Sequence, residues 1–113
     1  MAKILVVEDD PDQLCIRRQI LEQAGYEVAV AQTAAEALPQ LPGCRVVVMD
    51  LRLPAPEDGM ALIRAASSTA RIIVLSGAEP ETPLPVDQFL RKPFSSKKLL
   101  ETVARCCAPE AGG

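Results

Sequence analysis

The sequence predicts an α/β protein in which helices cover both faces of a parallel β-sheet. Continuous apolar runs recur at residues 4–7, 46–49 and 72–75, and a mixed run lies at 26–31. Uninterrupted runs of this length are typical of strands buried on both faces. The segments between the runs show helical spacing of apolar residues, and a fifth strand fits residues 88–91. Alternation of strand and helix indicates a layered sandwich with right-handed crossovers.

The first helix is predicted between residues 10 and 25. Asp10 stands at the N-cap position before Pro11, and Gly25 is placed to end the helix. Arg17 falls within the apolar face, so we expect its stem to pack while its guanidinium reaches water. The other members of that face are apolar: Leu14, Ile20, Leu21 and Ala24.

Three further helices follow from similar signals. Thr33 and Glu36 form a capping box that opens a second helix, which Pro39 and Pro42 should cut short. A third helix is expected from near Gly59 to Ser67. The last should begin after residue 95 or 96, and residues 108–113 have the composition of a frayed tail.

The composition disfavours several classes of function. Hydrophobic residues make up 49% and charged residues 24%, which is typical of a soluble domain. A net charge of -3 and only one Tyr and two Phe disfavour binding to nucleic acid, and no apolar run is long enough to cross a membrane. There is no histidine, and the four cysteines have no metal-ligand spacing. We interpret them as reduced thiols of a cytosolic protein.

Polar side chains follow the predicted strands at the points where the strands end. Glu8 and Asp9 follow the first strand, Asp50 ends the third, Ser76 ends the fourth and Lys92 follows the fifth. The carboxyl ends of parallel strands lie at one edge of a sheet, where ligands of such folds bind. We therefore expect these five residues to form one site.

Carboxylates crowded at one edge repel each other, and a divalent cation relieves that repulsion. Oxygen ligands suit Mg²⁺. A metal ion, an ammonium and a hydroxyl together are suited to stabilising a phosphoryl group during transfer. The sequence has no glycine-rich loop for a nucleotide, so the phosphoryl group should come from elsewhere, and an aspartate beside the metal can act as the nucleophile.

These motifs resemble the receiver domain of bacterial two-component response regulators, the CheY-like superfamily. The matching segments are Ile4–Asp10, Val48–Asp50 with Pro54 and Asp58–Gly59, Leu75–Ala78, and Phe89–Phe94. The resemblance implies a flavodoxin-like three-layer sandwich whose five-stranded parallel sheet has the order 2-1-3-4-5. It divides the chain into a receiver domain over 1–108 and a flexible C-terminal tail over 109–113.

The resemblance also implies a metal site. By position, Asp50 would be the phosphoacceptor and a ligand of Mg²⁺. Asp9 would bind the ion directly, Glu8 through water, and Arg52 through its backbone carbonyl.

Further residues and partners follow from the same resemblance. Ser76 and Lys92 would contact the phosphoryl oxygens, Phe89 would be an aromatic switch, and the Lys92–Pro93 bond is a candidate for the cis form. The donor would be a sensor histidine kinase or a histidine phosphotransfer protein. A downstream protein, rather than nucleic acid or a membrane, would read the phosphorylated state in the cytoplasm. Such a chain catalyses its own phosphorylation and dephosphorylation and is not an enzyme for a free substrate.

Simpler interpretations exist for each of these residues. The acidic run can serve the next helix N-terminus, and we assign that role to Asp10 as the cap. Ser76 can be a turn residue, Lys92 a solvated lysine and Phe89 a core residue.

Two other functions are open at the level of the sequence. A pseudo-receiver would bind a protein constitutively without the phosphoryl signal. A phosphatase of the aspartyl-phosphate type would need a second aspartate two residues after the nucleophile, but Leu51 and Arg52 follow Asp50.

The sequence departs from the family pattern in two places. The stretch from Asp50 to Gly59 is about one residue longer than the usual loop. The segment from Ser76 to Phe89 is shorter than usual and contains Pro80, Pro83 and Pro85. Because an interior proline costs a helix about 3 kcal/mol, we predict that the fourth helix of the family is shortened or missing.

Overall fold

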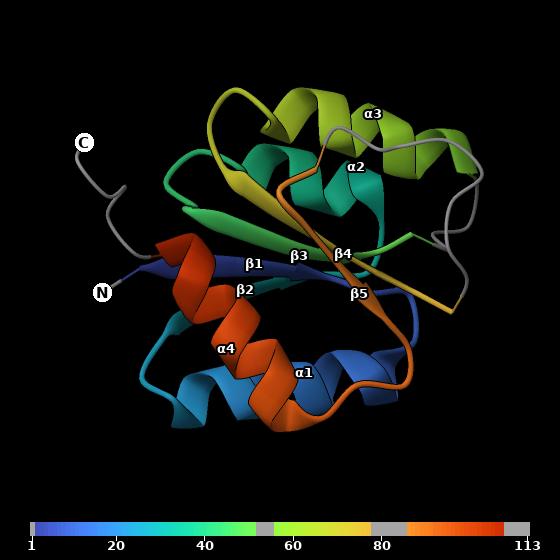
Figure 1. Cartoon of the computed structure of the whole chain (residues 1–113). Coiled ribbons are helices and arrows are strands. Elements are labelled where there is room, and N and C mark those ends of the chain that lie inside the picture. Colours follow the sequence, from blue (N-terminus) through green and yellow to red (C-terminus); the bar gives the residue numbers. More distant parts are fainter. Residues whose placement is uncertain (1, 52–55, 78–85, 108–113) are drawn as a thin grey trace.

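Five parallel strands form one sheet in the order β2-β1-β3-β4-β5 (Figure 1). The computed structural model describes residues 2–51, 56–77 and 86–107, with the backbone alone at 56–58. The strands are β1 (Lys3–Val7), β2 (Glu27–Ala31), β3 (Val46–Asp50), β4 (Arg71–Ser76) and β5 (Gln88–Arg91). Both the predicted strands and their predicted order are confirmed.

Helices cover both faces of this sheet. Figure 1 shows α1 (Pro11–Gln23) and α4 (Ser96–Cys107) on one face. The other face carries α2 (Ala34–Ala37), the 3₁₀ turn η1 (Leu38–Gln40) and α3 (Pro56–Ala66). The three-layer sandwich implied by the resemblance is therefore present.

Side-chain alternation explains why the central strands β1, β3 and β4 are apolar except at their ends. Successive residues of a strand point to opposite faces, and here each face meets a layer of helices. One set packs toward α2 and α3, namely Leu5, Val7, Val47, Met49, Ile72 and Val74. The other packs toward α1 and α4, namely Ile4, Val6, Val46, Val48, Ile73 and Leu75. All twelve are fully buried.

Local capping sets the helix ends as predicted. The Asp10 carboxylate accepts a hydrogen bond from the Asp12 N–H at 2.9 Å and caps α1. The Thr33 hydroxyl accepts from the Glu36 N–H at 3.1 Å, and α2 runs for only four residues before η1 begins. Gly25 follows α1 with a φ of 99°, a conformation that favours glycine.

Two details of the helix prediction are wrong. The third helix begins at Pro56 rather than near Gly59. Proline is favoured at the first helical position, because an N–H at that position would have no partner within the helix. Helical spacing predicts Ala24 on the apolar face of α1, but Ala24 is the exposed C-cap residue that follows the helix.

The predicted loss of the family's fourth helix falls on the segment between β4 and β5. Of this segment, residues 78–85 lie outside the described residues, and the flanking Gly77, Val86 and Asp87 are not helical. The described ranges hold four α-helices, and none of these lies between β4 and β5. The predicted tail also lies outside the described residues, and α4 ends at Cys107.

Candidate functional site

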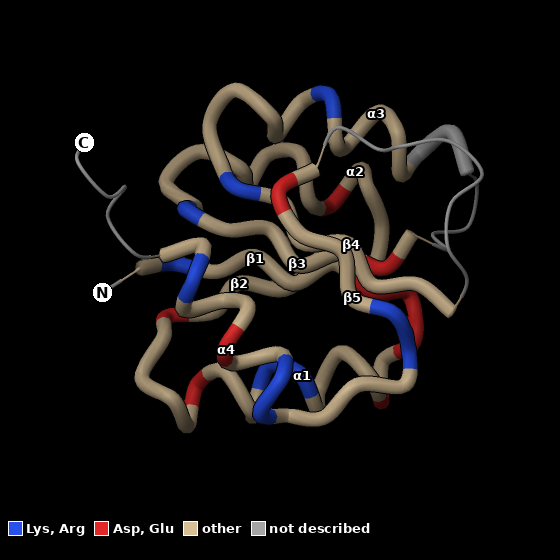
Figure 2. The backbone as a smooth tube through the Cα atoms, viewed as in Figure 1, with Lys and Arg blue, Asp and Glu red and all other residues tan. Residues whose placement is uncertain are grey.

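The register of the sheet brings the predicted site residues to one edge. Val7 pairs with Met49, so Glu8 follows β1 at the level where Asp50 ends β3. The pairing continues past the strand ends, since the Lys92 N–H donates to the Ser76 carbonyl at 2.8 Å. Figure 2 shows acidic positions gathered where β1 and β3 end, with a basic segment beside them after β5. We call this edge the acidic rim, formed by Glu8, Asp9, Asp50, Ser76 and Lys92.

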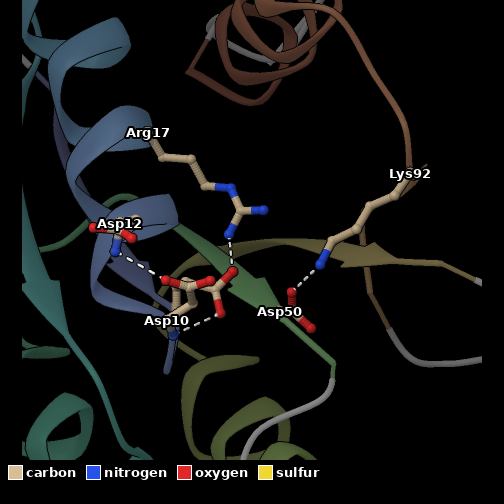
Figure 3. A network of polar contacts seen from close by, with 6 residues as sticks. Asp10, Asp12, Arg17, Asp50 and Lys92 are labelled. Atoms are coloured by element: carbon tan, nitrogen blue, oxygen red, sulfur yellow. Dashed lines mark hydrogen bonds and ion pairs between the residues drawn. The ribbon is translucent and has the colours of Figure 1, made fainter.

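Asp50 and Lys92 form an ion pair at the centre of the rim. The Lys92 ammonium donates to Asp50 Oδ2, and Figure 3 shows it extending toward that carboxylate from beyond β5. The Asp50 side chain is 4% exposed and that of Lys92 is 33% exposed. A buried carboxylate requires a compensating charge, and Lys92 provides it. The Lys92–Pro93 bond is cis, as the resemblance implies.

Glu8 has partners that the sequence did not predict. Its Oε1 accepts a hydrogen bond from Arg17 Nη1, and its Oε2 accepts from the Asp10 N–H at 3.2 Å. Arg17 is only 5% exposed, so the expectation that its guanidinium reaches water is wrong. The Glu8 carboxylate replaces water as the partner of the charge, which allows the whole side chain to be buried. One signal of this pairing is present in the sequence. Arg17 lies on the apolar face of α1, and the acidic Glu8 follows the strand that precedes this helix.

Burial raises the pKa of Glu8 above its ordinary value. The neighbouring Asp9 carboxyl and the negative charge of Asp50 raise it further, whereas the hydrogen bonds from Arg17 and from the Asp10 N–H lower it. The net direction is upward. The charged form of Glu8 is therefore destabilised by its surroundings even with the Arg17 guanidinium beside it.

The remaining predicted residues have different environments. Asp9 is exposed, and Ser76 is buried where β4 ends. Phe89 is partly buried and packs against the core on the α2 and α3 side, as its simpler interpretation predicted. Arg52, whose carbonyl was predicted to bind metal, lies outside the described residues. The register of the sheet thus places Glu8 and Asp50 at one rim, and the ion pair with Asp50 adds Lys92.

The donor set at the rim fits a divalent cation chemically. Its donors are carboxylate oxygens, which Mg²⁺ prefers, and the pKa of Glu8 is raised first by burial and then by the neighbouring Asp9 and Asp50 carboxyls. Among the described residues, no three acidic, cysteine or histidine side chains are close enough together to hold a metal. The contacts explain this spacing, because Glu8 points to Arg17 and Asp50 to Lys92. Binding of Mg²⁺ would therefore require rearrangement of side chains.

Comparison with known sequences agrees with this geometry. The family model of the response regulator receiver domain matches residues 4–104. The chain belongs to this family. The receiver domain is 34% identical to the C4-dicarboxylate transport transcriptional regulatory protein DctD of Pseudomonas aeruginosa, over 91% of this chain and 24% of that protein. It is also 34% identical to the alkaline phosphatase synthesis transcriptional regulatory protein SphR of Synechococcus elongatus, over 95% of this chain and 48% of that protein. The receiver domain spans about half or less of the length of these relatives.

Solved structures resemble the receiver domain over nearly its full length. A CheY-like receiver domain from Methanospirillum hungatei has a TM-score of 0.81 at 28% identity, covering 93% of this chain and 92% of that one. The response regulator TrrA of Thermotoga maritima, in complex with Mg²⁺ and BeF, has a TM-score of 0.79 at 28% identity, covering 94% and 99%. Within the described part of the receiver domain, no helix is long and apolar enough to cross a membrane.

The role of Asp10 gives a first prediction for the receiver domain. Asp10→Ala removes the α1 cap and is expected to lower the free energy of unfolding by about 1 kcal/mol. Its carboxylate bonds within its own helix turn, so the Mg²⁺ affinity should not change. Urea denaturation and calorimetric Mg²⁺ titration measure the two quantities. A large loss of Mg²⁺ affinity would assign Asp10 to the metal site instead.

The pKa of Glu8 gives a second prediction. Its folded-state pKa lies above the ordinary value of 4.5, so the folded state binds the proton more tightly than the unfolded state. The stability that Glu8 contributes is then fully present below pH 4.5 and lost as pH rises through the folded-state pKa. Urea denaturation from pH 4 to pH 8 should show wild type losing stability relative to Glu8→Gln as pH rises. A difference that is flat, or that moves the opposite way, would contradict the assignment.

Proposed function

We propose that this receiver domain accepts a phosphoryl group on Asp50 from a phosphohistidine, carried by a sensor histidine kinase or a histidine phosphotransfer protein. The observation that supports this most strongly is the buried Asp50 carboxylate at the rim, with the Lys92 ammonium on one of its oxygens. A carboxylate held in this way can attack phosphorus through one of its oxygens, and a cation lies beside the position where charge would develop.

The reaction is an in-line transfer. An oxygen of Asp50 forms a bond to phosphorus as the bond from phosphorus to the donor imidazole nitrogen breaks, and the electron pair stays on that nitrogen. Lys92 then donates to a phosphoryl oxygen instead of to the Asp50 carboxylate. The Ser76 hydroxyl is proposed to donate to another oxygen, from its buried position at the end of β4.

We assign the metal ligands from the same rim. Asp9, Asp50 and the backbone carbonyl of Arg52 would hold Mg²⁺, with Glu8 acting through water. Bound Mg²⁺ would neutralise negative charge on the transferring phosphoryl group. The solved complex of TrrA with Mg²⁺ and BeF, a protein 28% identical to this chain, supports the choice of metal.

Phosphorylation would act as a signal read by another protein. Moving Lys92 from a carboxylate to a phosphoryl group would shift an equilibrium between two arrangements of the rim. Phe89, on β5, is the proposed switch residue. The relatives named above are transcriptional regulators by name, and the match covers 24% and 48% of their lengths. A pseudo-receiver without phosphoryl transfer is not favoured, because the Asp50–Lys92 pair is intact.

The proposal is tested by incubating the protein with MgCl₂ and acetyl phosphate and measuring the intact mass. Wild type should gain one phosphoryl group that hydroxylamine removes, and chelation of Mg²⁺ should prevent the gain. Asp50→Asn should gain none, whereas Asp12→Asn, a matched change at an exposed residue of α1, should behave as wild type. Failure of wild type to form the adduct, or an equal adduct on Asp50→Asn, would refute the proposal.

A further inference from the structure

Two carboxylates of the acidic rim each form an ion pair with a cationic side chain of the same chain. Lys92 is paired with Asp50 (Figure 3), and Arg17 is paired with Glu8. The contact of Lys92 joins residues already assigned to phosphoryl transfer. Arg17 has no part in that proposal, yet its side chain is 6% exposed and its guanidinium bonds to a carboxylate assigned to the metal site.

We propose that Arg17 is an internal counter-cation that competes with Mg²⁺ for Glu8, so that binding of the metal breaks the Arg17–Glu8 ion pair. This inference rests on the proposed function, since it takes Glu8 as part of the metal site. Arg17 is thereby a positioning residue that sets how tightly the receiver domain holds its metal.

The contacts of Glu8 explain why the two cations compete. One carboxylate oxygen accepts from Arg17 and the other from the Asp10 N–H, so both point toward α1. Turning toward a metal, directly or through its bound water, requires at least the Arg17 contact to be released. A guanidinium and a metal ion beside the same carboxylate would also repel each other.

The charge count at the rim leads to the same conclusion. Glu8, Asp9 and Asp50 contribute three negative charges, and Lys92 and Arg17 contribute two positive charges, which leaves one net negative charge. Without Arg17 the rim would carry two. The rim with Arg17 present therefore attracts a divalent cation more weakly than the rim without Arg17 would.

The fold provides another environment for the released guanidinium. Arg17 Cζ lies 6.0 Å from the centroid of the Phe94 ring, within the range of a cation–π contact. Beside it is a cavity of about 480 Å³ between α1, α4 and the segment after β5, lined by Arg17, Lys92, Phe94, Ile16, Ile20 and Leu99 among others. Arg17 can therefore leave Glu8 without placing its charge in the apolar core.

Mg²⁺ titration of variants by calorimetry at pH 8 tests the competition. Arg17→Gln keeps a hydrogen-bond donor for Glu8 but removes the charge, and its Kd for Mg²⁺ should fall at least about tenfold below that of wild type. Arg18→Gln is the matched control, because Arg18 pairs with Glu22 in an exposed contact on the same helix, and its Kd should equal that of wild type. In a Glu8→Gln background, Arg17→Gln should have a much smaller effect. An unchanged or higher Kd for Arg17→Gln would overturn the inference.

A measurement on the unmodified protein removes dependence on how the variants fold. In NMR spectra of wild type, the Arg17 side-chain Nε–H resonance should shift in step with Mg²⁺ occupancy, and that of Arg18 should not. If the Arg17 resonance stays fixed while backbone signals of Asp9 and Asp50 report binding, the proposed competition is overturned and the proposed function is not. A wild type that binds no Mg²⁺ and forms no phosphoryl adduct would instead refute the proposed function.

Discussion

Replacing Lys92 by methionine is expected to slow phosphorylation of Asp50 by about 100-fold, the effect typical of losing one preorganised donor at a site of developing charge. Lys92 contacts the carboxylate that we assign as nucleophile, from its position directly after β5. Methionine has a similar length and no charge, so the change isolates the ammonium. Time courses of intact mass with acetyl phosphate and saturating MgCl₂ give the rate.

Lys97→Met is the matched control for this prediction, because Lys97 is an exposed lysine in the first turn of α4. Its rate should equal that of wild type. Circular dichroism checks that both variants are folded. A Lys92→Met protein that is phosphorylated as fast as wild type would show that the ammonium is not part of the transfer site.

Arg17→Met is expected to lower the free energy of unfolding by about 3–5 kcal/mol at pH 7 without Mg²⁺. The change leaves Glu8 buried, with the Asp9 carboxyl and the charge of Asp50 as neighbours and only the Asp10 N–H as a donor. The loss should be smaller at pH 5, because protonation of Glu8 removes the buried charge at less cost there. Urea denaturation followed by circular dichroism measures these differences.

Two comparisons interpret the loss in Arg17→Met. The double variant Glu8→Gln with Arg17→Met removes both charges and should recover most of the stability, since a buried ion pair can be replaced by neutral groups at little cost. Arg18→Met breaks an exposed pair and should cost about 1 kcal/mol or less. If Arg17→Met costs no more than Arg18→Met, the ion pair with Glu8 is not a significant part of the folded state.

The sheet and its acidic rim could be predicted from the sequence because local patterns determine both. Runs such as Val46–Met49 have no polar residue to place on a solvent face, and parallel strands bring the residues that follow them to one edge. The caps at Asp10 and Thr33 were equally accessible, since each bonds within a few residues of its own position.

The partner of Arg17 was not accessible in the same way. Helical spacing showed that Arg17 shares the apolar face of α1, but spacing within a helix says nothing about which group lies opposite. The Glu8 carboxylate precedes the helix and turns back toward it, so only the three-dimensional structure shows that the guanidinium is paired rather than hydrated. The start of the third helix at Pro56 was missed because the predicted apolar face begins only at Met60.

The central claim, that Asp50 is the phosphoacceptor, is tested most directly by mapping the modified residue. Treating the phosphorylated protein with borohydride reduces an aspartyl phosphate to homoserine, and peptide mass spectrometry then locates that residue. We predict homoserine at position 50 and at no other position. Homoserine at position 9, or reduction of another carboxylate with Asp50 unmodified, would contradict the proposal.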